Sequence, residues 1–144
     1  MPREWVSRSE RDTMDVGRAL AAGLAAGAMV HLNGDLGAGK TVFVRGLAEG
    51  LGIDRDDVSS PTFTLIQEYE GRDGRKLFHV DLYRLAGSEV GDLGLDALAG
   101  EGIVAIEWAN RLPDPDRRAI IVTIEEVDEE MRRIHIEGLP GDGE

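Results

Sequence analysis

The sequence predicts an α/β fold, in which a central mixed β-sheet is flanked by helices and extended by β-hairpins. Residues 28–32 form a short apolar run, which a glycine-rich segment and a helical pattern follow. Residues 102–107 form a second apolar run that ends in an acid, as expected for a central parallel strand with both faces covered. Two pairs of segments with alternating apolar and polar residues predict the hairpins. These patterns fit a single domain that spans residues 1–144.

The glycine-rich segment fits the phosphate-binding pattern G-x-x-x-x-G-K-[ST] at every position. It consists of Gly34, Asp35, Leu36, Gly37, Ala38, Gly39, Lys40 and Thr41. Glycines let successive backbone N–H groups point at phosphate oxygens, the lysine adds a positive charge, and the threonine hydroxyl can bind Mg²⁺. A helix that starts near Lys40 adds its positive N-terminus. We therefore expect a P-loop NTPase-like fold that binds ATP and Mg²⁺, since the Asn-Lys-x-Asp signature that reads guanine is absent.

Capping signals and alternation predict the remaining elements. In chain order they are a helix from Ser9 or Thr13 to about Ala25 that Gly27 ends, a helix over residues 42–51 capped by Gly52, hairpin strands over 60–69 and 76–82, a short helix over 93–99, and hairpin strands over 119–125 and 132–137. Residues 1–8 and 139–144 are expected to be loosely ordered.

Composition limits the partners and the location. The formal net charge of −12 at pH 7 makes direct binding to a nucleic acid backbone unfavourable. The chain has no cysteine, so it forms no disulfide and no thiolate metal site, which fits the reducing cytosol. Residues 1–11 are charged and lack the apolar run of a signal peptide, and no apolar stretch approaches a membrane span. The expected location is cytoplasmic, without membrane association.

A phosphate loop needs an acid at the end of a neighbouring strand to hold Mg²⁺. Glu107 ends the apolar run 103–106, and Asp81 ends a strand that looks like half of a hairpin. We favour Glu107 as the metal-side acid. Asp81 is then a second group near the metal or the residue that positions the attacking water. The structural alternative for Asp81 is a partner for Arg84 or for a backbone turn.

Four other side chains are candidates for the site. Thr62 and Thr64 follow a polar loop, and in nucleotide switches such threonines close over Mg²⁺ and the γ-phosphate, although threonine is also common in strands. His79 lies on the same strand face as Asp81, so both a contact with the site and a structural role are open. For Trp108, packing at the edge of the site, contact with a partner and ordinary core packing are all open.

Further segments accompany the phosphate loop in order along the chain. They are Ser60-Pro61-Thr62-Phe63-Thr64, His79-Val80-Asp81-Leu82-Tyr83-Arg84, Leu95-Asp96 and Glu107-Trp108. Together with the loop, this set resembles the bacterial TsaE family, also called YjeE, over roughly residues 9–137. The His-x-Asp-Leu-Tyr-Arg and Glu-Trp elements discriminate far better than the loop alone. Many members carry a second glutamate where this chain has Asn110, so the local partner surface is expected to differ.

The resemblance implies a P-loop ATPase that is needed for threonylcarbamoyladenosine modification of tRNA position 37. TsaE-like proteins act with TsaD, which carries the transfer chemistry, and with TsaB, which dimerises with TsaD. The resemblance therefore implies that this protein contacts tRNA only through the complex. The resemblance also assigns roles to individual residues. Lys40 and Thr41 match the phosphate and Mg²⁺ ligands, Thr62 and Thr64 a switch-like segment, Asp81 an acid important for hydrolysis, Glu107 a Mg²⁺-side acid, and Trp108 the family's tryptophan at the nucleotide.

Two other functions fit the same loop. A small-molecule kinase needs an acceptor pocket and usually an arginine-bearing lid, for which only residues 71–76 offer basic side chains near a turn. A nucleotide-gated binding module would use ATP only to order residues 62–64 for docking. The ATPase interpretation predicts slow hydrolysis alone and faster hydrolysis with partners, because Arg84 is only a weak candidate for an arginine finger in cis. Self-association of the free protein stays open.

Overall fold

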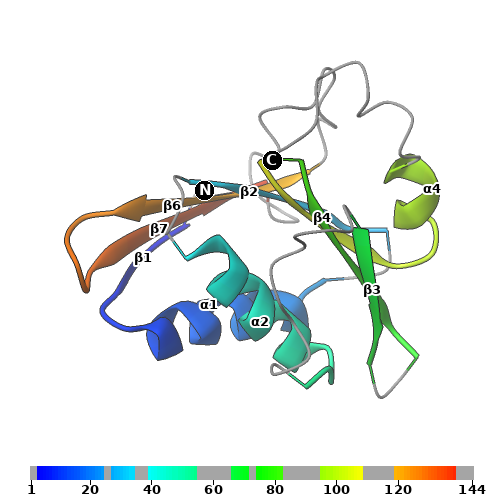
Figure 1. Ribbon diagram of the computed structural model, residues 1–144, viewed down its shortest axis with the longest axis horizontal. Coiled ribbons are helices and arrows are strands. Elements are labelled where there is room, and N and C mark those ends of the chain that lie inside the picture. The colour runs from blue at the N-terminus through cyan, green and yellow to red at the C-terminus, as the bar shows by residue number, and fades with distance from the viewer. Residues whose placement is uncertain are drawn as a thin grey trace.

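The computed structural model describes residues 3–24, 27–34, 39–54, 66–71, 74–82, 95–108 and 119–138. Its helices are α1 (Glu10–Ala22), α2 (Lys40–Gly50) and α4 (Leu95–Ala99). Its strands are β1 (Arg3–Ser7), β2 (Met29–Asn33), β3 (Ile66–Glu70), β4 (Lys76–Asp81), β5 (Ile103–Glu107), β6 (Ile120–Glu126) and β7 (Arg132–Glu137). The strands form one mixed sheet in the order β1-β7-β6-β2-β5-β4-β3, with α1 and α2 side by side on one face (Figure 1). The predicted α/β class is confirmed.

The centre of the sheet is parallel and its flanks are antiparallel. β2 pairs in parallel with β5 and with β6, and β5 pairs in parallel with β4. The carboxyl ends of β2, β4 and β5 therefore meet at one end of the sheet, where ligands of open α/β sheets bind. β3 pairs antiparallel with β4 and β6 with β7, as predicted for the two hairpins, while residues 60–65 of the first predicted strand lie outside the described residues. β4 thus belongs to a hairpin and to the parallel centre at once.

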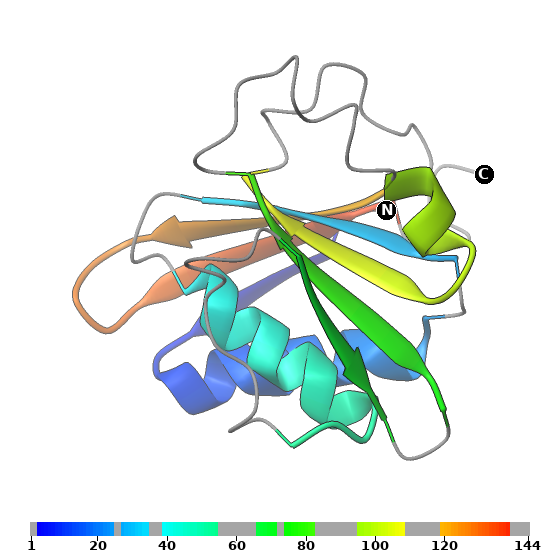
Figure 2. The same ribbon diagram turned by 45° about the vertical axis from the view of Figure 1, so that its right-hand side comes forward.

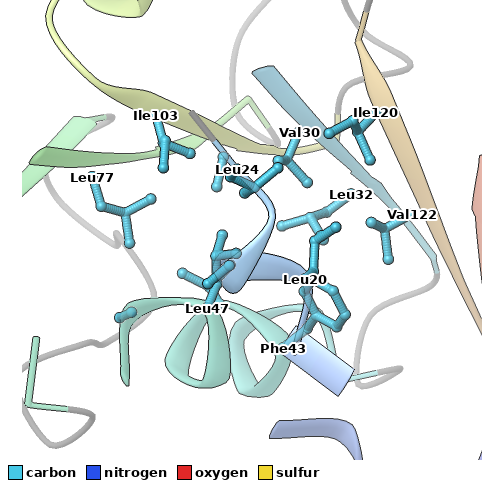
Figure 3. Close-up of a cluster of buried hydrophobic side chains, with 14 of the residues drawn as sticks. Leu20, Leu24, Val30, Leu32, Phe43, Leu47, Leu77, Ile103, Ile120 and Val122 are labelled. Carbon is cyan, nitrogen blue, oxygen red and sulfur yellow. The ribbon is translucent and has the colours of Figure 1, made fainter. Parts of the chain in front are cut away.

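Side chains of the central strands alternate between two apolar cores. On one face, Leu20 of α1 and Phe43 and Leu47 of α2 point toward the sheet (Figure 3). The strand residues that meet them are Val30, Leu32, Leu77, Ile103, Ile120 and Val122. On the other face, Phe78, Val80, Val104 and Ile106 belong to a second cluster, against which α4 packs with Leu98 and Ala99. Figure 2 shows α4 on the side of the sheet away from α1 and α2.

Two glycines bring the backbones of α1 and α2 into direct contact. A Cβ added to Gly46 would lie 2.1 Å from the carbonyl oxygen of Met14, and one added to Gly17 would lie 2.4 Å from that of Phe43. Side chains at either position would force the helices apart, because real Cβ contacts are never that short. The close packing of α1 and α2 therefore depends on glycine at both positions.

The expectation of a loose N-terminal octet is wrong for Arg3–Ser7, which form the edge strand β1. Trp5 pairs with Ile134 of β7 and packs against the main core. The Ser7 hydroxyl is buried and lies 2.7 Å from the Thr13 hydroxyl of α1. The strand was not predicted because charged residues surround the two inward-facing side chains, Trp5 and Ser7. Its partner strand also lies at the other end of the chain. Residues 1–2 and 139–144 lie outside the described residues.

The first helix ends earlier than expected. Ser9 caps it by accepting a hydrogen bond from the Asp12 amide, as predicted for one of the two candidate caps. It stops at Ala22 rather than near Ala25, because the Gly23 amide bonds back to the Leu20 carbonyl and closes the last turn. None of the helices in the described ranges is both long and apolar enough to cross a membrane.

Candidate functional site

The phosphate-loop motif begins at the carboxyl end of β2, an inner strand of the parallel centre. Gly39 has a φ of 108°, a left-handed conformation that suits glycine, and it directly precedes α2. No side-chain hydrogen bond caps α2 at Gly39, so no described side chain at the cap occupies the first amides of the helix. Such a helix N-terminus attracts anions. Residues 35–38 lie outside the described residues.

Lys40 is buried at the start of α2, with 4% of its surface exposed. Its Nζ donates a 2.6 Å hydrogen bond to the carbonyl oxygen of Gly34, across the mouth of the loop. The same Nζ lies 3.6 Å from the centre of the Trp108 ring, within the range of a cation–π contact. The lysine charge is therefore held at the loop by a backbone dipole and an aromatic face.

Trp108 follows β5 in a backbone conformation that is unusual for a bulky residue. Its φ is 61°, and no other non-glycine residue in the described ranges has a positive φ. Such a conformation costs about 1–3 kcal/mol and persists only where the surroundings impose it. Here it turns the chain at the end of β5 so that the indole meets Lys40. The structure places the Trp108 ring against Lys40 and also against the second apolar core, while a contact with a partner stays open.

The second half of the site comes from the ends of β5 and β4. The Thr41 hydroxyl donates a 3.2 Å hydrogen bond to Oε2 of Glu107, a carboxylate that is 4% exposed. His79, buried within β4, places Nε2 2.5 Å from the same oxygen. Asp81 pairs with Glu107 in the parallel register of β4 and β5, so both acids end neighbouring strands. The structure therefore joins Glu107 directly to the phosphate-loop threonine and leaves Asp81 beside it.

The donor set at Thr41 and Glu107 fits a magnesium ion. A hydroxyl and a carboxylate supply hard oxygen ligands, which Mg²⁺ prefers. In the part of the chain that the structure describes, no three His, Cys, Asp or Glu side chains gather closely enough to cage a metal. Mg²⁺ is usually held by one or two carboxylates together with substrate phosphates and water. The arrangement suits a cation that arrives with a phosphate ligand.

A cavity beside the phosphate loop was not predicted from the sequence. Its volume is about 410 Å³, and it shares Gly39 and Val42 with the start of α2. The rest of its lining comes from the start of α1, the turn between β6 and β7, and the first residue of β7: Arg8, Ser9, Glu10, Thr13, Glu129, Glu130 and Arg132. The sequence identified Ser9 and Thr13 only as helix caps and residues 127–131 only as a turn, because these segments are distant along the chain.

Some predicted site residues lie outside the described residues. They are Asp35, Leu36, Gly37, Ala38, Thr62, Thr64, Arg84 and Asn110. Their assignments stay predictions.

The parallel centre and the strand–loop–helix at β2 define an α/β protein of the P-loop fold class. The crystal structure of Bacillus subtilis YdiB superposes with a TM-score of 0.75 at 32% identity, covering 96% of this chain and 86% of that one. The tRNA threonylcarbamoyladenosine biosynthesis protein TsaE of Aquifex aeolicus is 42% identical over 135 residues, which is 93% of this chain and 95% of that protein. The Bacillus subtilis protein of the same name is 44% identical, covering 83% of this chain and 75% of that protein.

A family model described as threonylcarbamoyl adenosine biosynthesis protein TsaE matches residues 7–134. The chain belongs to the TsaE family, which serves in tRNA threonylcarbamoyladenosine biosynthesis. The resemblance expected from the sequence motifs is confirmed.

Proposed function

We propose that this protein binds ATP with Mg²⁺ and hydrolyses it to support turnover of TsaB-like and TsaD-like proteins that modify tRNA position 37. The observation that carries the proposal is the hydrogen bond between Thr41 and Glu107, next to a buried Lys40 at a helix N-terminus. This arrangement supplies what phosphoryl transfer needs, namely an anion-binding helix end, a fixed cation and an oxygen pair for a metal.

The phosphates would bind at the N-terminus of α2. Lys40 would exchange the Gly34 carbonyl for phosphate oxygens, which are stronger acceptors because they are charged. The Thr41 hydroxyl and the Glu107 carboxylate would hold Mg²⁺. When bound, the metal ion neutralises charge on the phosphate oxygens.

Hydrolysis would follow from the position of Asp81 beside Glu107. A water oxygen forms a bond to the γ-phosphorus, the bond to the β,γ-bridging oxygen breaks so that ADP leaves, and the proton of the water passes to an oxygen of the phosphate product. The Asp81 carboxylate can accept a hydrogen bond from that water and orient it. Thr62 and Thr64 would close over the γ-phosphate, as the family resemblance implies.

The cavity beside the loop would hold the nucleoside. Because it shares Gly39 and Val42 with the start of α2, a base and ribose attached to phosphates on the loop can reach it. Its volume of about 410 Å³ lies in the range of small-molecule sites. The Arg132 guanidinium donates hydrogen bonds to the Asp128 and Met131 carbonyls of the same turn, and the face of this planar group can stack on a base.

Replacing Arg132 with alanine is expected to weaken ATP binding about tenfold, because a stacking contact with the base is lost. Binding of inorganic tripolyphosphate, which has no base, should stay within about twofold. Calorimetric titration of both ligands measures this. Arg133→Ala is the matched control, since Arg133 pairs with Glu4 and Glu125 and does not line the cavity. Equal losses of affinity for ATP and for tripolyphosphate would show that the base does not bind in this cavity.

The test of the whole proposal is Mg²⁺-dependent ATP hydrolysis by the purified protein, alone and with its cognate TsaB-like and TsaD-like proteins. We expect slow release of phosphate from the protein alone and a clear stimulation by the two partners together. Bound ATP without stimulation would favour the nucleotide-gated binding module. Transfer of the γ-phosphate to a hydroxylated metabolite would favour the kinase.

A further inference from the structure

We propose that His79 is a positioning residue that holds the Glu107 carboxylate in place for Mg²⁺. The inference rests on the proposed function. His79 lies in the middle of β4, opposite Ala105 of β5, and its side chain is fully buried. Its Nε2 lies 2.5 Å from Oε2 of Glu107. Since a carboxylate accepts, the ring donates from Nε2.

The second ring nitrogen of His79, Nδ1, lies in an environment that disfavours a polar atom. Nδ1 is buried and has no hydrogen-bond partner in the part of the chain that the structure describes. A buried polar atom without a partner costs about 1–3 kcal/mol. An apolar side chain would fill this position in the sheet without that cost. The hydrogen bond to Glu107 is thus the chemical reason for a histidine here.

The hydrogen bond from His79 also restrains Glu107 when a metal ion is bound, because the Glu107 carboxylate has a second partner in Thr41. The Oε2 atom accepts from the Thr41 hydroxyl as well as from His79. A cation that binds both Thr41 and Glu107 replaces the direct bond between them. His79 is then the described residue that still restrains the carboxylate, whose side chain would otherwise regain rotamer freedom. Outer partners of this kind tune metal affinity about 10–100-fold.

The test compares His79→Leu with His79→Gln in the full-length protein. Glutamine can offer an amide donor near the position of Nε2, whereas leucine keeps the bulk and removes the donor. ATP affinity is measured in EDTA, and Mg²⁺ affinity is measured at saturating ATP. We expect the leucine variant to keep ATP affinity in EDTA within about twofold and to bind Mg²⁺ about 10–100-fold more weakly. The glutamine variant should recover most of that loss.

Two further measurements separate positioning from folding. Unfolding by urea without ligands measures the stability of each variant, because leucine removes the Nδ1 that has no described partner but also removes one donor to the buried Glu107 carboxylate. Glu107→Gln should weaken Mg²⁺ binding by itself, and adding His79→Leu to it should cause little further loss, because both changes act through one carboxylate. Additive losses in the double variant would contradict the inference.

A leucine variant with wild-type Mg²⁺ affinity overturns the inference, and so does equal loss in the leucine and glutamine variants. If the leucine variant does not fold, His79→Asn replaces it, because its shorter amide does not reach Glu107 as glutamine does. Asparagine and glutamine variants with the same Mg²⁺ affinity then overturn the inference. Failure of the wild-type protein to bind ATP would instead refute the proposed function. The two outcomes are distinguishable, because the proposed function is tested on the wild-type protein and the role of His79 is tested on the variants.

Discussion

Replacing Lys40 with alanine is expected to lower ATP affinity about 100–1000-fold in the presence of Mg²⁺. The lysine charge is buried at the loop, so its contacts with phosphate oxygens are little weakened by water. Hydrogen bonds to charged groups contribute about 1.5–3 kcal/mol each, and two of them account for a change of this size. In the free protein the ammonium contacts the Gly34 carbonyl and the Trp108 ring, so the urea midpoint of the variant is measured beside its ATP affinity.

Lys76→Ala is the matched control for Lys40→Ala. Lys76 lies at the opposite end of β4 and pairs with Glu68 at 3.3 Å. The hydrogen bond to Glu68 and its negative charge raise the pKa of Lys76, so this control also removes one positive charge at neutral pH. Calorimetric titration with ATP and Mg²⁺ should find the Lys76 variant close to wild type. Similar affinities for both variants would mean that the phosphates bind elsewhere.

Replacing Asp81 with asparagine is expected to slow ATP hydrolysis about 100–10,000-fold while ATP affinity stays near that of wild type. Asparagine offers the attacking water a neutral acceptor oxygen in place of a charged one, so it orients the water less well. The phosphate loop, Lys40 and Thr41 are unchanged in this variant. Glu107→Gln should instead weaken Mg²⁺ binding first. Single-turnover hydrolysis with saturating ATP and varied Mg²⁺ separates the two effects.

The opposite pattern would exchange the roles of the two acids. If Asp81→Asn weakens Mg²⁺ binding while Glu107→Gln blocks only hydrolysis, Asp81 is the metal-side acid. A third result concerns the biological role. If Asp81→Asn stops hydrolysis while tRNA modification by the reconstituted complex continues, ATP acts by binding alone.

The parts of the site that local sequence encodes were predictable. The glycines, Lys40 and Thr41 define the loop, and an apolar run that ends in Glu107 defines a central strand and its terminal acid. Alternation in the strand also placed His79 on the face of Asp81. The contact of Lys40 with Trp108 was not predictable, because a positive φ in tryptophan leaves no local pattern.

Features that depend on distant segments were missed for a common reason. β1 forms because Trp5 meets Ile134, and the cavity forms because the start of α1 meets the turn before β7. Both arrangements join the two ends of the chain, so periodicity within a short window carries no information about them. The bond between His79 and Glu107 likewise joins two strands that are separate in sequence but adjacent in the sheet.

The close packing of α1 against α2 sets the distance between the cavity and the phosphate loop. One helix begins at the cavity and the other begins at the phosphate loop, and their backbones approach closely at Gly17 and Gly46. A side chain larger than hydrogen at either glycine would push the helices apart and change the distance between the cavity and the loop. If the proposed nucleotide site is correct, the distance between the base and the phosphates would be matched to this packing of the two helices. A nucleotide with one phosphate fewer would then lose either its contact with the cavity or its contact with the phosphate loop.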